Sequence, residues 1–205
     1  PETAYLNPKL TIIYEDLRGE EPEHIVYHEE EGIIGFVRDL NKKAEVLHDV
    51  VYFKGESKDI TVEAAFQYTN EFHENILGFC NNIYNAEGGT HITGFKTIFT
   101  TVMNQYARQL GILKEKDANF TGADVRNGMT AVISIKHPDP RFEGQTKTKL
   151  DNQDASRITA KVTGDEIQLF FDKNLETLKT VLSCAEKAAK IDRKSTRLNS
   201  SHDDV

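Results

Sequence analysis

The chain has 205 residues, of which 38% are hydrophobic and 28% charged, and it carries a net charge of −8 and two cysteines. Its longest apolar runs fall far short of the ~18 residues that a membrane-spanning helix needs, and no charged-then-apolar leader is present. Cys80 and Cys184 stand far apart without Cys-x-x-Cys or Cys/His spacing, so neither a disulfide framework nor a zinc site is indicated. We expect a globular protein of a reducing cytosol, and a first residue other than methionine leads us to expect a fragment.

The first 41 residues predict a small unit of their own. Residues 10–14 and 24–28 are rich in β-branched and aromatic side chains and predict two short strands joined by an acidic connection. Helical spacing of apolar side chains predicts an amphipathic helix over residues 32–41, carried by Ile33, Phe36, Val37 and Leu40. The polar run that begins at Asn41 then indicates a domain boundary.

Two histidines in the second predicted strand, His24 and His28, raise the alternative of a metal pair. Four strand residues span roughly 13 Å, which is too far for two side chains to share one ion. Ordinary strand residues are the favoured interpretation, and no metal site is predicted.

Residues 50–84 predict a sheet. Residues 50–53 predict one strand, and residues 60–69 alternate strictly, with Ile60, Val62 and Phe66 on one face and Glu63 and Gln67 on the other. A third strand over residues 76–83 is expected to pair antiparallel with the second.

A glycine pair, Gly88 and Gly89, lies in the loop predicted over residues 84–94. The pair is open to two interpretations, a phosphate cradle or a turn in which Thr90 caps the following helix, and the turn is favoured. Apolar residues with helical spacing from Phe95 to Leu110 then predict a long helix laid on the sheet.

The second half of the chain predicts a short helical turn over residues 123–126 and a half-buried strand over 129–137. Pro138 and Pro140 end that strand and lead into a loop over residues 142–150 with two lysines, Lys147 and Lys149. A helix interrupted or weakened near Gly164 and a last helix over residues 175–189 follow. Taken alone, the two lysines are ordinary solvated loop charges.

Several motifs in a fixed order resemble the ATPase subunit of bacterial type IIA DNA topoisomerases. They are ENILGFCNNI at 74–83, EGGTH at 87–91 with Gly94 and Phe95, TGADVR at 121–126, MTAVISIK at 129–136 and EGQTKTKL at 143–150. Any one of these motifs is weak evidence, but together they cover roughly residues 5–190. The resemblance leaves open which member of the family this is and whether it supercoils or decatenates DNA.

The resemblance implies an α+β fold in two parts. Residues 1–41 would be the C-terminal end of a GHKL (Bergerat) ATPase domain. Residues 42–191 would be a transducer domain of the ribosomal protein S5 domain 2-like β-α-β type, with C-terminal helices. In that family the Gln-Thr-Lys loop of the transducer reaches the γ-phosphate of ATP, which here implies Gln145 and Lys147, supported by Gly144 and Thr146.

The resemblance also implies cofactors and partners. ATP and Mg²⁺ are expected as cofactors, with the Mg²⁺ ligands and all catalytic residues outside this chain, so that the chain alone is expected not to hydrolyse ATP. Expected partners are double-stranded DNA, the topoisomerase A subunit and a second B subunit, in a cytoplasmic complex of two A and two B subunits without a membrane. The function implied is coupling of ATP hydrolysis to DNA strand passage.

One position departs from the family. Many members carry an arginine in the middle of the long transducer helix, facing the cavity for the transported DNA, and the matching residue here is Thr101. A threonine cannot supply the charge for a phosphate contact, so direct DNA contact there is in doubt, with Lys96 and Arg108 as possible substitutes.

Two alternatives stay open from the sequence, another GHKL ATPase of mismatch-repair or chaperone type, and a free-standing S5-like binding module. A net charge of −10 over residues 1–100 (8 Lys/Arg against 18 Asp/Glu) speaks against a module that binds nucleic acid. Residues 192–205 resemble one reading frame of a sequencing adapter and are expected to be an artefact.

Overall fold

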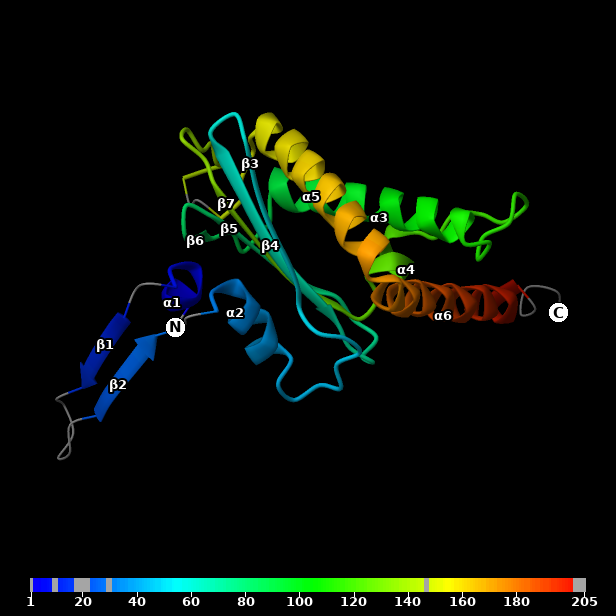
Figure 1. The fold of residues 1–205 in the computed structure, drawn as a ribbon, viewed down its shortest axis with the longest axis horizontal. Coiled ribbons are helices and arrows are strands. Elements are labelled where there is room, and N and C mark those ends of the chain that lie inside the picture. Colours follow the sequence, from blue (N-terminus) through cyan, green and yellow to red (C-terminus); the bar gives the residue numbers. More distant parts are fainter. Residues whose placement is uncertain (1, 9–10, 17–22, 29–30, 146–147, 201–205) are drawn as a thin grey trace.

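The computed structural model describes residues 2–8, 11–16, 23–28, 31–145 and 148–200 (Figure 1). A first group of elements precedes the main sheet: α1 (Glu2–Leu6), β1 (Thr11–Asp16), β2 (Glu23–His28) and α2 (Ile33–Leu40). The rest of the chain forms β3 (Val51–Ser57), β4 (Ile60–Tyr68), β5 (Asn75–Cys80), β6 (Ile83–Tyr84), α3 (Thr90–Gln109), α4 (Gly122–Arg126), β7 (Met129–Lys136), α5 (Gln153–Lys173) and α6 (Leu175–Ser200). The fold is therefore a mixture of helices and antiparallel and parallel strands.

The main sheet has five strands in the order β3-β4-β7-β5-β6. β7 lies in its centre, antiparallel to β4 and parallel to β5. The predicted antiparallel pairing of the third strand with the second is wrong, because β7 occupies the place between β4 and β5. A parallel pair needs a long crossover connection, and α3 supplies it between β5 and β7. The predicted strand over 76–83 is also split by a turn in which Asn81 and Asn82 adopt positive φ.

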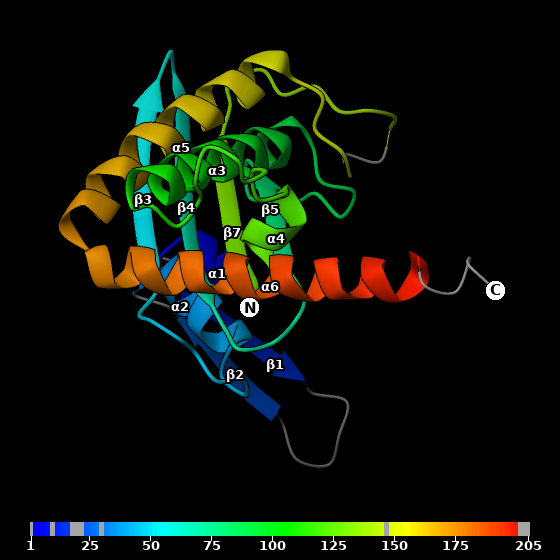
Figure 2. The same cartoon turned by 90° about the vertical axis from the view of Figure 1, so that its right-hand side faces the viewer.

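The two faces of the sheet are covered by different helices. Figures 1 and 2 show α3 and α5 over one face and α2 over the other. On the α3 and α5 face, Phe66 of β4 meets Phe99 edge to face at 5.2 Å between ring centroids. On the opposite face, Ala65 and Val132 form a second apolar cluster with α2 residues. Because both faces are covered, β4 is buried along almost its whole length, beyond what its alternating pattern predicts.

The predicted helix over 32–41 is confirmed as α2, which ends at Leu40 with Asn41 as its C-cap residue. The Asn41 side chain is buried and bonded to two strands: its Nδ2 donates to Gln67 Oε1 at 3.0 Å, and its Oδ1 accepts from Thr130 Oγ1 at 2.8 Å. α2 and the main sheet are therefore joined both by apolar packing and by the hydrogen bonds of Asn41. A domain boundary at residue 41 stays a prediction.

α5 is one unbroken helix, so the predicted interruption near Gly164 is wrong. Gly164 is instead a packing position, because a Cβ there would come within 3.0 Å of the Ile98 side chain on α3. Gly94 of α3 plays the same part nearer the other end, where a Cβ would lie 2.4 Å from the carbonyl oxygen of Ser156. The two glycines let α3 and α5 approach closely over the sheet, and this packing outweighs the low helix propensity of glycine.

The last helix, α6, runs from Leu175 to Ser200, longer than predicted. The assignment of residues 192–205 to a sequencing artefact stays a prediction. Among the described helices, none combines the length and the apolar character that crossing a lipid bilayer requires.

Candidate functional site

The candidate site is the loop that follows the central strand β7. Gly144 lies at its tip with φ +79, and a Cβ there would meet nothing within 4 Å, so the backbone conformation and not the packing calls for glycine. Gln145, the first predicted phosphate contact, is exposed beside it. Thr146 and Lys147 lie outside the described residues. The structure therefore places one of the two predicted phosphate contacts, at the solvent-facing end of the loop.

The two limbs of this loop pair with each other like a short hairpin. The Glu143 N–H donates to the Lys149 carbonyl at 2.8 Å, and Phe142 and Leu150 form an antiparallel bridge. The Lys149 ammonium group lies 2.9 Å from the Glu143 carboxylate, which raises the pKa of Lys149. The second lysine of the motif is therefore engaged by its own loop.

The return limb is also tied to the segment before α3. The Glu87 N–H donates to the Thr148 carbonyl at 2.9 Å, and the Thr148 hydroxyl donates to a Glu87 carboxylate oxygen at 3.0 Å. Further along, the Thr90 N–H donates to the Leu150 carbonyl at 3.0 Å. The loop is thus held against the start of α3.

These contacts explain the glycine pair. Gly89 has φ +152, and a Cβ on it would lie 2.7 Å from the Leu150 carbonyl oxygen, so only glycine allows the two backbones to approach. The prediction that Thr90 caps α3 is wrong: the N-cap is Gly89, without a side-chain cap, and Thr90 is the first helical residue. Gly88 closes a turn, since its N–H donates to the Asn85 carbonyl at 2.9 Å, whereas Gly89 allows the close approach of the loop.

The possible DNA-contacting side chains on α3 differ in their surroundings. Thr101 is exposed, and its hydroxyl donates to the Thr97 carbonyl at 3.0 Å. The Arg108 guanidinium donates to the carbonyls of Lys114 and Asp117, each at 2.9 Å, and to Asn119 Oδ1. Arg108 therefore holds the loop after α3, which makes it a poor candidate for the DNA contact that the resemblance leads us to expect at position 101.

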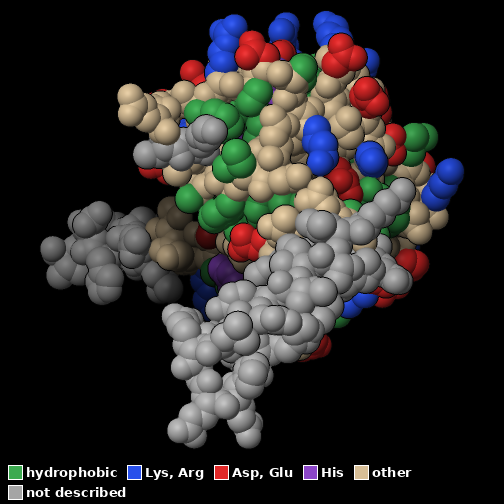
Figure 3. Space-filling model, turned by 90° about the vertical axis from the view of Figure 1, so that its left-hand side faces the viewer, with side chains coloured by type: hydrophobic (Ala, Val, Ile, Leu, Met, Phe, Trp, Pro, Cys, Tyr) green, Lys and Arg blue, Asp and Glu red, His purple; other side chains and the backbone are tan. Residues whose placement is uncertain are grey.

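Basic and acidic side chains are mixed on another face of the molecule. On the face seen in Figure 3, Lys and Arg side chains stand along the upper rim with Asp and Glu among them. This rim does not form the single-signed basic stripe that is typical of a nucleic-acid surface.

The histidines considered for a metal pair lie in β2, where the structure describes the backbone and not the side chains. Within the described residues, no group of three or more His, Cys, Asp or Glu side chains is arranged to hold a metal ion.

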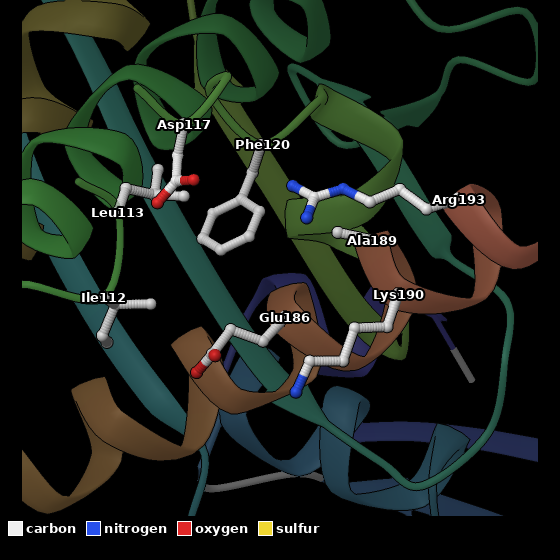
Figure 4. A pocket seen from close by; sticks show the side chains of 8 residues that line it. All are labelled: Ile112, Leu113, Asp117, Phe120, Glu186, Ala189, Lys190 and Arg193. Atoms are coloured by element: carbon white, nitrogen blue, oxygen red, sulfur yellow. The ribbon is translucent and has the colours of Figure 1, made fainter. Parts of the chain in front are cut away.

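A small pocket of about 80 Å³ lies away from the loop, between α6 and the segment after α3 (Figure 4). Phe120 and Leu113 line it from one side, and Glu186, Lys190 and Arg193 of α6 line it from the other (Figure 4). Its lining joins apolar residues to charges of both signs, and none of these residues belongs to the loop after β7.

Comparison with solved structures gives the class of protein. The 43K ATPase domain of Thermus thermophilus gyrase B, solved with an aminocoumarin, matches with a TM-score of 0.85 and 30% identity, over 97% of this chain and 53% of that one. The topoisomerase IV ATP-binding domain of Francisella tularensis matches in fold, with a TM-score of 0.76 at 23% identity, over 93% of this chain and 51% of that one. The fold therefore matches about half of the ATPase region of bacterial type II topoisomerases.

The sequence narrows this class, because the family model for DNA gyrase B matches residues 32–200. The chain belongs to the DNA gyrase B family. It is 45% identical to the DNA gyrase B protein of Enterococcus faecalis over 203 residues, which cover 96% of this chain and 32% of that protein. It is 46% identical to the DNA gyrase B protein of Streptococcus pneumoniae over 192 residues, 92% of this chain and 29% of that protein. The chain thus spans about a third of the length of these relatives.

Proposed function

We propose that this chain is the transducer segment of a bacterial type II DNA topoisomerase B subunit and that its loop after β7 senses the γ-phosphate of ATP. In this proposal residues 1–41 end a GHKL ATPase domain, and residues 42–191 form an S5-like transducer domain. The observation that carries the proposal is the exposed Gln145 at the tip of a loop whose two limbs are paired and tied to α3.

The donors of this loop fit a phosphate group. Gln145 offers an exposed amide with two N–H donors, and Lys147 offers a compact positive charge with three. Lys149 is held by Glu143 at 2.9 Å, so we assign the phosphate contact to Lys147. ATP bound by the rest of the ATPase region, with Mg²⁺ ligands outside this chain, would supply the γ-phosphate oxygens on which negative charge gathers.

A phosphate contact made by this loop would couple the state of the bound nucleotide to the orientation of the transducer. Gln145 and Lys147 would hold the transducer in one orientation while the nucleotide is intact and release it after phosphate loss, because a ligand favours the conformation that it binds better. We propose that this movement drives DNA strand passage in a cytoplasmic complex of two B subunits, two A subunits and double-stranded DNA. Catalytic residues and DNA cleavage lie outside the chain in this scheme.

Substitution of the two loop lysines in a complete B subunit that carries this segment tests the proposal. Lys147→Ala should lower ATP turnover by at least about tenfold, which corresponds to about 1.4 kcal/mol of transition-state stabilisation. Lys149→Ala is the matched control, since it removes the same charge two positions away and should change turnover less than about twofold, as expected for an exposed ion pair. Equal effects of the two substitutions, or unchanged turnover in Lys147→Ala, would refute the assignment.

A further inference from the structure

The loop leaves β7 through a segment, Pro138 to Arg141, that has few backbone donors. Pro138 and Pro140 carry no N–H, so Asp139 and Arg141 hold the only two backbone N–H groups of the four residues. Both of these N–H groups are bound by side chains: Asp139 donates to His137 Nδ1 at 3.0 Å, and Arg141 donates to Asn152 Oδ1 at 2.6 Å. Two polar side chains thus bind both backbone donors of this outgoing limb.

The His137 side chain joins this limb to α5. Its side chain is only 4% exposed. Because Nδ1 accepts a hydrogen bond from a backbone N–H, the ring hydrogen is on Nε2, which donates to Asp154 Oδ1 at 2.9 Å. Asp154 lies in the first turn of α5, and the bond to His137 lowers the pKa of its carboxyl group.

The Asn152 side chain binds the loop backbone instead of capping α5. It is the N-cap residue of α5, where an asparagine side chain ordinarily accepts a hydrogen bond from the first helical turn, yet it makes no such bond. Its Oδ1 accepts from the Arg141 N–H instead, and its Nδ2 donates to the Asp139 carbonyl at 3.1 Å. An N-cap hydrogen bond typically stabilises a protein by about 1 kcal/mol. The Asn152 side chain lacks this bond and instead holds the backbone of the loop.

The backbone of His137 is fixed as well. Asn81, in the turn after β5, accepts the His137 N–H and donates to the His137 carbonyl, both at 2.9 Å. The outgoing limb is therefore anchored to β5 and α5, whereas the return limb is anchored to the start of α3. The tip that carries Gln145 stands between these two anchors.

We propose that His137 and Asn152, with Asp154, are positioning residues that set where the loop tip presents Gln145 and Lys147. They would act through the loop without touching the nucleotide. This inference rests on the proposed function, since it assumes that the loop tip contacts phosphate. It adds a set of residues that no sequence motif identified: a histidine before the Pro-x-Pro segment and two polar residues at the start of the following helix.

A double-mutant cycle on ATP turnover in a complete B subunit that carries this segment tests the inference. His137→Leu removes both side-chain bonds and should lower kcat about tenfold with less than about a twofold change in KM for ATP, because the lost contact acts in the transition state. His137→Asn keeps an acceptor for the Asp139 N–H and should recover part of that loss. In a Lys147→Ala background, His137→Leu should cause a clearly smaller loss than in the unaltered subunit, because only Gln145 is then left for the loop to position and residues that act as one unit are not additive.

Two positions in the first turn of α5 complete the design. Asp154→Ala, which removes the acceptor of the His137 ring from a side chain that is 43% exposed, should lower kcat about threefold, the scale of one hydrogen bond. Gln153→Ala lies between Asn152 and Asp154, is exposed, and serves as the control with unchanged turnover. If His137→Leu fails to fold, Asp154→Ala decides the matter.

The outcomes separate this inference from the proposed function. Unchanged kcat in His137→Leu and Asp154→Ala, or losses that simply add to that of Lys147→Ala, would overturn the positioning role and leave the phosphate contact standing. If Lys147→Ala itself has no effect, the proposed function fails and the inference fails with it.

Discussion

Replacing His91 with leucine should make the free energy of unfolding of this chain depend less on pH in the acidic range. His91 lies in the first turn of α3 and is fully buried, and neither of its ring nitrogens has a hydrogen-bond partner among the described residues. The backbone of β5 closes over it, since a Cβ on Gly78 would lie 2.8 Å from Nε2. Burial without a partner disfavours the charged ring and lowers the pKa of His91 to about 4 from an ordinary 6.5.

The size of the effect follows from the two pKa values. Between pH 6.5 and 4 the unfolded chain binds a proton at this histidine and the folded chain does not, so stability falls as the pH falls. The contribution is fully present above the unfolded pKa. About 2 kcal/mol of stability should be lost between pH 7 and pH 5, and about 3 kcal/mol by pH 4.

Urea unfolding of the 205-residue chain at pH 7, 6 and 5 measures this loss. Between pH 7 and pH 5, His91→Leu should lose at least about 1.5 kcal/mol less unfolding free energy than the unaltered chain. At pH 7 the two proteins should be about equally stable, because an apolar group replaces unpartnered nitrogens. His73→Leu is the control, since that side chain is 63% exposed and meets solvent in both states. Parallel stability curves for His91→Leu and the unaltered chain would show that the folded protein accommodates the charged ring, which refutes the reasoning.

Three further substitutions probe the anchoring of the loop and the core. Gly89→Ala should lower the free energy of unfolding by about 3 kcal/mol, because its Cβ would collide with the Leu150 backbone, whereas Gly88→Ala, with φ +78 and open space around it, should cost only about 1 kcal/mol. Equal losses in urea unfolding would contradict the close approach. Tyr68→Phe should cost about 1–2 kcal/mol in thermal unfolding, because the buried hydroxyl donates to the Val125 carbonyl at 2.6 Å, and an unchanged melting temperature would argue against that bond.

Local elements could be predicted from the sequence more readily than the partners they pack against. The alternating pattern of residues 60–69 predicts β4 correctly, because a side-chain period of two is a property of the strand itself. The neighbour of β4 cannot be read from that pattern, and the pairing predicted for β5 is wrong. The interruption predicted near Gly164 is wrong because helix propensity alone takes no account of the neighbouring Ile98.

In the candidate site, too, local features could be predicted from the sequence, whereas contacts between distant segments could not. Gln145 and Lys147 come from a resemblance of motifs, and the turn at Gly88 and Gly89 comes from the chemistry of glycine. The anchoring of the loop is not predicted, because His137 and Asn152 gain their roles only from backbone groups that the fold brings to them. A Pro-x-Pro segment flanked by polar residues is the one signal in the sequence that could have suggested side-chain acceptors there.

The central place of β7 has a consequence for how the protein is made. β7 pairs with both β4 and β5, yet its residues, Met129–Lys136, leave the ribosome long after theirs. Until then the β3–β4 hairpin and the β5–β6 pair are two half-sheets with unpaired edges, the kind of surface that promotes association between chains. The nascent protein can join its sheet only when residue 136 has emerged, so a chain that stalls shortly before that point would be more prone to aggregate than one that stalls after it.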